Sequence, residues 1–261
     1  MQKFYIKNRK GLNMVGNILV PENPKGLSFV LHGLGGFKEQ LQIKALADTL
    51  FKNSFIVVNF DATNSIGESD GKYQDATMQN HYEDLVDVIN WAETQSWCKE
   101  PFVLAGHSLG GYAVARYAEE FSKKVKAVFP FAAVFSGKDS FEASNKFNKE
   151  ELKKWEETGW KIKIGRSKPG LEMKLPWSHM EERLKHDLKP NADKINMPIL
   201  FVVGENDTSC PPDQQKKFFD LLSENTNKEF YIIKGMSHTP REEEYLNKLK
   251  EIFDNWLKRL N

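Results

Sequence analysis

The feature that most constrains the fold of this chain is a regular alternation of short apolar runs with amphipathic segments. The runs at residues 55–60 and 198–203 are almost continuously apolar and rich in β-branched and aromatic side chains. Such runs predict strands that are buried on both faces. Residues 79–94 instead repeat apolar side chains at the i, i+3, i+4, i+7 spacing of an amphipathic helix. The alternation predicts an α/β fold with a mostly parallel central sheet and helices on both faces.

The same two patterns assign most of the chain. We expect buried strands at residues 27–31, 55–60, 101–105, 125–129, 198–203 and 229–233, and helices at residues 39–51, 79–94, 112–121, 212–222 and 241–260. Two further strand-like runs lie in residues 1–20 on either side of Gly11, and they predict an antiparallel hairpin at the sheet edge.

Residues 136–195 break this rhythm, because they are rich in charge and contain no buried-strand run. Their pattern predicts two short helices at residues 148–158 and 178–188 and, between them, a hairpin of residues 160–164 and 171–175 with a turn at 165–170. Gly159 is expected as a helix C-cap, and Ser178 with Glu181 as a capping box. The period-two alternation in both hairpin strands predicts one apolar face.

An insert with its own amphipathic elements between two core strands predicts a cap over a site. We therefore expect two parts. Residues 1–135 and 196–261 form the α/β core, and residues 136–195 form the inserted cap.

Composition excludes several classes of protein. The 261 residues suffice for one large domain, and the formal net charge of +1 provides no field that would attract nucleic acid. No stretch resembles a secretory signal or is long enough to span a membrane. The two cysteines, Cys98 and Cys210, lack the spacing of a disulfide framework or a zinc site. We expect a cytoplasmic protein that uses no metal or organic cofactor.

The motif G-x-S-x-G at residues 106–110 directly follows a predicted strand and directly precedes a predicted helix. Strand, tight turn and helix is the context in which this motif presents a nucleophilic serine. The turn leaves no room for side chains two residues before and two residues after the serine, which explains both glycines. We therefore expect Ser108 to be a catalytic nucleophile at the N-terminus of a helix, where the helix dipole favours developing negative charge.

A serine hydroxyl needs a general base, and His238 is the best candidate. It follows the last predicted strand, at the sheet edge where α/β folds place their sites. Asp207 follows the preceding strand and is expected to orient the imidazole, with Glu205 as a weaker alternative. Asp61 is expected to brace the loop that follows it. The other five histidines are expected elsewhere: His32 in a glycine-rich loop, His81 as a surface or packing residue, His107 pointing away within the elbow, and His179 and His186 in the cap.

The loop H-G-L-G-G at residues 32–36 follows the first central strand. Its glycines allow backbone N–H groups to turn inward and hold an oxyanion. We assign one donor to the N–H of Leu34 and the other to the N–H of Leu109. The loop lacks the G-K-[ST] of a phosphate-binding loop.

Together these motifs, in this order, resemble the α/β-hydrolase superfamily over nearly the whole chain. Within it the chain is similar to small capped bacterial esterases of the feruloyl or cinnamoyl type, and to monoacylglycerol lipases and serine aminopeptidases. Residues 60–69 are similar to the Asp-x-x-Gly-x-Gly-x-Ser loop of these families, although Ser65 stands where that loop usually has a glycine. The resemblance implies that Asp139 contacts the phenolic end of a substrate, with a solvated loop aspartate as the alternative.

The sequence thus predicts a serine hydrolase that cleaves a small carboxylic ester (EC 3.1.1) through a Ser108 acyl-enzyme. Trp155, Trp160 and Trp177 are expected either to line an acyl pocket or to pack the cap onto the core. A peptidase, an aminopeptidase or an acyl-thioesterase on the same triad is the first alternative. A non-catalytic ligand-binding protein is the second. The sequence leaves a homodimer open.

Overall fold

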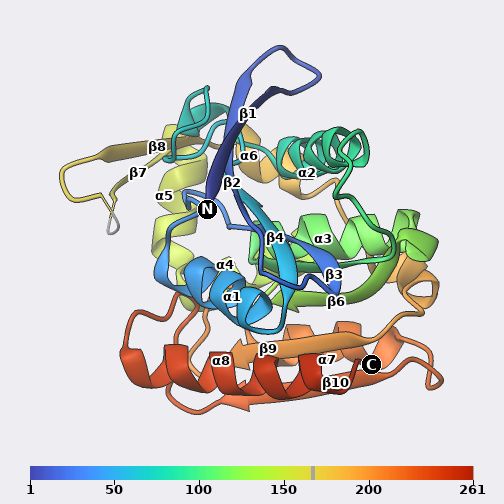
Figure 1. Cartoon of the computed structure of the whole chain (residues 1–261). Coiled ribbons are helices and arrows are strands. Elements are labelled where there is room, and N and C mark those ends of the chain that lie inside the picture. Colours follow the sequence, from blue (N-terminus) through green and yellow to red (C-terminus); the bar gives the residue numbers. More distant parts are fainter. Residues whose placement is uncertain (166–167, 261) are drawn as a thin grey trace.

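The computed structural model describes residues 1–165 and 168–260 of the chain. Its centre is an eight-stranded sheet of order β1-β2-β4-β3-β5-β6-β9-β10, and Figure 1 shows the helices around it. The pairs β1–β2 and β2–β4 are antiparallel, and every other pair in this sheet is parallel. The predicted mostly parallel α/β sheet with an antiparallel hairpin at its edge is confirmed.

The bounds of the elements follow the sequence predictions closely in the core. The strands are β1 (Gln2–Lys7), β2 (Asn13–Leu19), β3 (Gly26–Leu31), β4 (Phe55–Phe60), β5 (Phe102–His107), β6 (Val125–Phe131), β7 (Trp160–Ile164), β8 (Glu172–Pro176), β9 (Ile199–Gly204) and β10 (Lys228–Ile233). The α-helices are α1 (Leu41–Lys52), α2 (Met78–Glu93), α3 (Leu109–Glu120), α4 (Gly137–Phe147), α5 (Lys149–Thr158), α6 (Ser178–Arg183), α7 (Pro212–Leu221) and α8 (Glu243–Lys258). Short 3-10 turns are η1 (Tyr73–Asp75), η2 (Ser122–Lys124) and η3 (Lys189–Lys194).

Each face of the sheet has its own apolar core. On one face, side chains of α1 and α8 pack against strand residues such as Val57 and Val103. On the other face, α2, α3 and α7 cover residues such as Phe29 and Leu104. Every residue of β4, β5 and β9 is buried, which is why these strands read as continuous apolar runs. Among the residues described, no helix has the length and apolarity needed to cross a bilayer.

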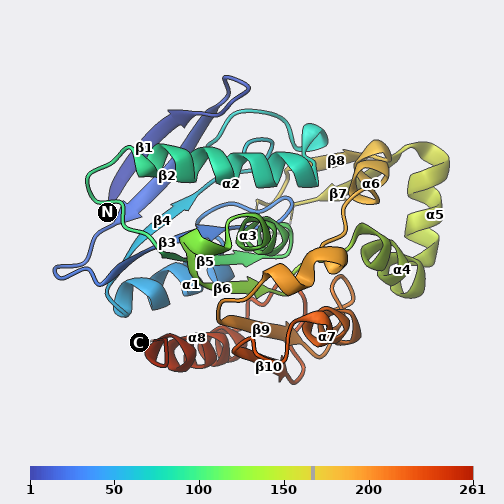
Figure 2. The same cartoon turned by 90° about the vertical axis from the view of Figure 1, so that its right-hand side faces the viewer.

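Residues 136–195, here called the β6–β9 segment, contain α4, α5, the hairpin β7–β8, α6 and η3. Figure 2 shows α4, α5, α6 and the hairpin gathered at one end of the molecule, whereas η3 packs against α3 and α7 of the core. The structure has three α-helices here, where two were predicted. The additional helix is α4, whose only buried apolar side chain is that of Ala143. A helix with so little apolar surface has no stripe from which it could be recognised. The predicted turn at 165–170 includes residues 166 and 167, which lie outside the described residues.

Two local predictions in this segment were wrong. The N-cap of α6 is Trp177 rather than Ser178, and no side chain caps the helix, so the predicted capping box is absent. α6 also ends at Arg183 rather than at residue 188. The predicted C-cap at Gly159 is confirmed by its left-handed φ of 74°.

The hairpin β7–β8 has no single apolar face, contrary to the prediction. Ile162 is paired with Lys174, and both side chains are exposed. Met173 and Leu175 lie on the opposite face and are 3% and 4% exposed. Both strands alternate with period two, but their register places the apolar side chains of β7 outward and those of β8 inward. A shift by one residue reverses the face of every side chain in a strand, and sequence alone does not set this register.

Candidate active site

The chain turns sharply between β5 and α3, and Ser108 stands at the apex with φ 55° and ψ −113°. Two close approaches explain the flanking glycines. A Cβ on Gly106 would lie 2.3 Å from the carbonyl oxygen of Gly110, and a Cβ on Gly110 would lie 2.2 Å from that of Leu31. The predicted lack of room for side chains at these two positions is confirmed. The strained serine conformation is held by the packing around it.

Ser108, His238 and Asp207 meet in one hydrogen-bonded chain. The Nε2 atom of His238 lies 3.0 Å from the Ser108 Oγ, and its Nδ1 lies 2.8 Å from the Asp207 Oδ2. The other carboxylate oxygen, Oδ1, accepts hydrogen bonds from the backbone N–H groups of Ser209 and Cys210 at 2.9 and 2.8 Å. The buried carboxylate is therefore fixed in the orientation in which it accepts the Nδ1–H of the imidazole.

The loops that carry Asp207 and His238 are joined to each other. The backbone N–H of Asn206 donates to the carbonyl of Met236 at 3.0 Å, and the Glu205 carboxylate accepts from the N–H of Gly235 at 2.9 Å. Glu205, the alternative candidate for the residue that orients the imidazole, thus binds a backbone N–H of the loop that carries His238.

His107 contacts His238, although the sequence analysis expected it to point away from the site. Its Nε2–H donates to the backbone carbonyl of His238 at 2.8 Å, and the two ring centroids are 4.8 Å apart. Burial first, and then the neighbouring His238, lower the pKa of His107 to about 3. The ring therefore stays neutral at ordinary pH and keeps the donor that holds the His238 backbone.

The glycine-rich loop lies against the serine, because a Cβ on Gly33 would lie 2.9 Å from the Ser108 Cβ. Within the described part of the chain, neither the N–H of Leu34 nor that of Leu109 donates a hydrogen bond to a protein acceptor. Two backbone donors beside the serine, one in the glycine-rich loop and one at the start of α3, are what an oxyanion requires. His32 fixes this loop, since its Nδ1–H donates to the carbonyl of Gly33 at 2.8 Å and its Nε2 accepts from the N–H of Ala62 at 3.0 Å.

A buried lysine, Lys38, anchors the far end of the same loop, and the sequence analysis missed it. Its Nζ lies 2.9 Å from the Asp61 Oδ2 and also pairs with Glu68. Burial alone would lower the pKa of Lys38, but the hydrogen bonds of Glu68 and Asp61 outweigh it and raise that pKa. Asp61 also accepts from the N–H of Glu68 at 2.8 Å, in agreement with its expected bracing role. The only sequence signal for Lys38 is its place just after the glycine cluster.

The β6–β9 segment packs over the glycine-rich loop. A cluster of four buried apolar side chains contacts Leu34 and Tyr73; its members are Leu152, Trp155, Leu175 and Met180. The rings of Trp155 and Trp177 meet edge to face with centroids 5.3 Å apart. Trp160 does not join them, because it lies on the outward face of the hairpin and is 43% exposed. Two of the three predicted tryptophans are therefore near the glycine-rich loop.

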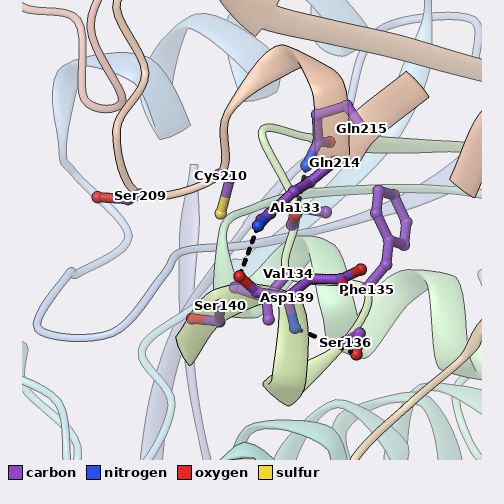
Figure 3. Close-up of a pocket in the computed structure, with 10 residues that line it drawn as sticks. All are labelled: Ala133, Val134, Phe135, Ser136, Asp139, Ser140, Ser209, Cys210, Gln214 and Gln215. Carbon is purple, nitrogen blue, oxygen red and sulfur yellow. Dashed lines mark hydrogen bonds between the residues drawn. The ribbon is translucent and has the colours of Figure 1, made fainter. Parts of the chain in front are cut away.

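Asp139 lines a small cavity beside the site, and Figure 3 shows it with the Cys210 thiol and the Ser140 hydroxyl. Its carboxylate lies 3.0 Å from the Nζ of Lys189. The cavity volume is only about 10 Å³, which is about the minimum for a single water. Cys210 was not foreseen in the site, yet it lines this cavity and its backbone N–H donates to the Asp207 carboxylate at 2.8 Å. Its position three residues after Asp207 is the signal that could have identified it.

Comparisons with known proteins identify the family and the fold. The family described as "Serine aminopeptidase, S33" (Hydrolase_4) matches residues 22–244. An Escherichia coli relative, an "Uncharacterized 31.7 kDa protein in traX-finO intergenic region", is 25% identical over 273 residues, which cover 94% of this chain and 92% of the relative.

Solved structures share the fold at low identity. Est1E from Butyrivibrio proteoclasticus, with ferulic acid bound, has a TM-score of 0.80 at 21% identity over 98% of both chains. The mouse alpha/beta hydrolase domain-containing protein 10 has a TM-score of 0.79 at 18% identity over 100% of both chains. The predicted hydrolase class and superfamily are confirmed: this chain belongs to the serine aminopeptidase S33 family of α/β-hydrolases.

Proposed function

We propose that this chain is a serine hydrolase that cleaves carboxylic esters, with Ser108 as the nucleophile. The observation that carries the proposal is the chain of hydrogen bonds from Asp207 through His238 to Ser108, at 2.8 and 3.0 Å. Nucleophile, base and orienting carboxylate within hydrogen-bond reach form the arrangement that acyl transfer through a serine requires.

The reaction proceeds in two steps. His238 Nε2 takes the Ser108 proton as Oγ bonds to the carbonyl carbon, and the resulting oxyanion accepts from the N–H groups of Leu34 and Leu109. The C–O bond to the alcohol then breaks, and the alcohol leaves with the proton from His238. In the second step water gives a proton to His238 as its oxygen bonds to the acyl carbon, the bond from that carbon to the Ser108 Oγ breaks, Oγ takes the proton back from His238, and the carboxylic acid leaves. Asp207 stabilises the imidazolium that forms in each step.

The β6–β9 segment acts as a cap in this proposal. Its apolar cluster lies over Leu34, and a Cβ on Gly35 would lie 2.5 Å from the Met173 side chain of the hairpin. A roof of apolar side chains over an oxyanion loop excludes water and strengthens the hydrogen bonds beneath it.

Replacing Ser108 by alanine tests the proposal. On p-nitrophenyl acetate and butyrate, Ser108→Ala should lower kcat by roughly 10⁴-fold. Ser209→Ala is the matched control, because Ser209 is exposed and contacts Asp207 through its backbone N–H. The wild type should also be labelled by a fluorophosphonate probe and the Ser108→Ala variant should not. Near-wild-type turnover by Ser108→Ala would refute the assignment.

An aminopeptidase or a thioesterase on the same triad is the second candidate. The family description "Serine aminopeptidase, S33" favours the first of these. The nucleophilic machinery is shared by all three reactions, so rates on matched esters, acyl-thioesters and aminoacyl amides decide among them.

A further inference from the structure

In α6 of the β6–β9 segment, the guanidinium of Arg183 is held by two neutral groups. Its Nη1 donates to the Ser140 hydroxyl at 2.8 Å, and its Nη2 donates to the His179 Nε2 at 3.0 Å. In residues 1–165 and 168–260, no carboxylate oxygen lies within 4.0 Å of its nitrogens. Its Nε is shielded from solvent and has no hydrogen-bond partner there. A shielded guanidinium without a counter-charge is unusual, because burial of an unpaired charge is unfavourable.

The two groups that hold Arg183 orient it without neutralising it. The Nδ1–H of His179 donates to the carbonyl of Ala76 at 2.7 Å, so its Nε2 lone pair faces the guanidinium. Burial first, and then Arg183, lower the pKa of His179 to about 3, which keeps this acceptor neutral. Two of the five guanidinium N–H groups are thus used, and the Nε–H is among the three that remain.

The adjacent acid, Glu182, is committed elsewhere. Its two oxygens accept from the backbone N–H groups of Met78 and Gln79, each at 3.0 Å, and one of them also contacts His186. These contacts tie α6 to the first turn of α2. Glu182 therefore forms no ion pair with Arg183, although it is adjacent in the chain.

Arg183 is also connected to the proposed triad through a short chain of contacts. Cys210 is part of it, because its backbone N–H donates to the Oδ1 of Asp207 at 2.8 Å. Ser140, which accepts from Arg183, lines the same cavity as Cys210 in Figure 3. The Tyr73 hydroxyl is a second shielded polar group without a hydrogen-bond partner among the described residues. The Tyr73 ring in turn lies next to Gly35 of the glycine-rich loop.

We propose that Arg183 binds a carboxylate of the substrate, so that the preferred substrates are esters that also carry a free carboxylate group. This inference rests on the ester hydrolase function proposed above. A carboxylate matches the planar guanidinium, which can donate to both of its oxygens in parallel. It would supply the missing counter-charge and accept from the idle Nε–H.

The same residue disfavours aminoacyl substrates. An aminoacyl amide carries an ammonium group next to the scissile carbonyl, and this charge has the same sign as the Arg183 guanidinium. Juxtaposed like charges repel each other. Arg183 therefore selects against the aminopeptidase reaction with the same charge that selects for a carboxylate.

Two substrate pairs test the proposal and locate the carboxylate. The acyl pair is 4-nitrophenyl hemisuccinate and its neutral methyl ester, and the alcohol pair is 4-acetoxybenzoate and its neutral methyl ester. The wild type should hydrolyse the charged member of one pair with a kcat/KM roughly 10- to 100-fold higher than the neutral member. The pair that shows the preference identifies the side of the substrate that Arg183 contacts.

Variants separate recognition from a purely structural role of Arg183. Arg183→Gln should abolish the preference, and Arg183→Lys, which keeps the charge but loses the fork of donors, should reduce it. Lys154→Gln is the matched control, because it removes the same charge from an exposed position on α5 and should keep the preference. If Arg183 only braces the segment, Arg183→Gln lowers the rates of both members equally.

The failures of the two proposals differ. If the wild type hydrolyses none of the four esters, the ester hydrolase function itself is wrong. If it hydrolyses them with no preference in either pair, or if the preference survives in Arg183→Gln, the carboxylate site is wrong. The wild-type comparison needs no variant, so it stays decisive even if Arg183→Gln fails to fold.

Discussion

The two sides of Ser108 are built by different kinds of contact. Below it, Asp207 and His238 stand on loops at strand ends, and backbone hydrogen bonds join these loops to each other. Above it, the β6–β9 segment is tied to the core largely by side chains, such as the Glu182 carboxylate on the N–H groups of Met78 and Gln79 and the His179 ring on the carbonyl of Ala76. Backbone contacts survive most substitutions, whereas side-chain contacts change with each one. This fold therefore fixes the proposed acyl-transfer machinery and leaves substrate recognition free to vary.

The largest expected effect separates two aspartates, one from each side. Asp207→Asn should lower kcat by about 10⁴-fold, because the amide cannot hold the imidazole in the productive tautomer. Asp139→Asn removes only the ion pair with Lys189 and should change kcat/KM by less than roughly tenfold. Both are measured on p-nitrophenyl butyrate, with circular dichroism to verify folding. A larger loss of activity in Asp139→Asn than in Asp207→Asn would contradict the roles assigned to the two aspartates.

The second prediction tests the register of the hairpin. Leu175 is 4% exposed on the inner face and Ile162 is 54% exposed on the outer face. Leu175→Ala should lower the free energy of unfolding of the protein by about 2–5 kcal/mol. Ile162→Ala should change it by no more than about 0.5 kcal/mol. Urea unfolding measures both, and equal effects would mean that the two faces of the hairpin are not distinct in solution.

The sequence predicted the side below Ser108 far better than the side above it. Strands such as residues 55–60 are buried on both faces, so their apolar runs are unmistakable, and the motifs at strand ends inherit their positions from the sheet. The proximity of Ser108, Asp207 and His238 follows from this, since parallel strands end at one edge.

Above Ser108 the signals were weak for identifiable reasons. α4 buries almost no apolar surface. In the hairpin, the pairing register places the apolar side chains of β8 inward and those of β7 outward, and the pattern of either strand alone does not indicate this. Arg183 was invisible to sequence reasoning, because an arginine near the end of a polar helix is normally solvated. Lys38 was missed for the same reason, since only the fold brings Asp61 and Glu68 to it. Charged residues buried by tertiary contacts leave no periodic trace in the sequence.

The smallest expected effect concerns a buried histidine on each side. His81, in α2, is fully buried, and burial first, then the nearby His32, lower its pKa to about 3. His179 in the β6–β9 segment has a pKa of about 3, caused first by burial and then by Arg183. Between pH 6.5 and about 3 the unfolded chain binds a proton at each residue that the folded chain does not. Each histidine makes its full contribution to the free energy of unfolding above this pH window. Within the window this contribution falls by about 1.4 kcal/mol for each unit by which the pH is lowered.

His81→Phe should therefore flatten the pH dependence of the unfolding free energy by about 1.4 kcal/mol per unit between pH 6 and 4. Above pH 7.5 the slopes of variant and wild type should coincide, which is the internal control. His179→Phe should flatten the slope equally if the segment and the core unfold as one cooperative unit. Urea unfolding by tryptophan fluorescence measures both slopes. A flattening seen for His81→Phe alone would show that the β6–β9 segment unfolds before the core. The side-chain contacts of the segment would then be lost independently of the contacts in the core.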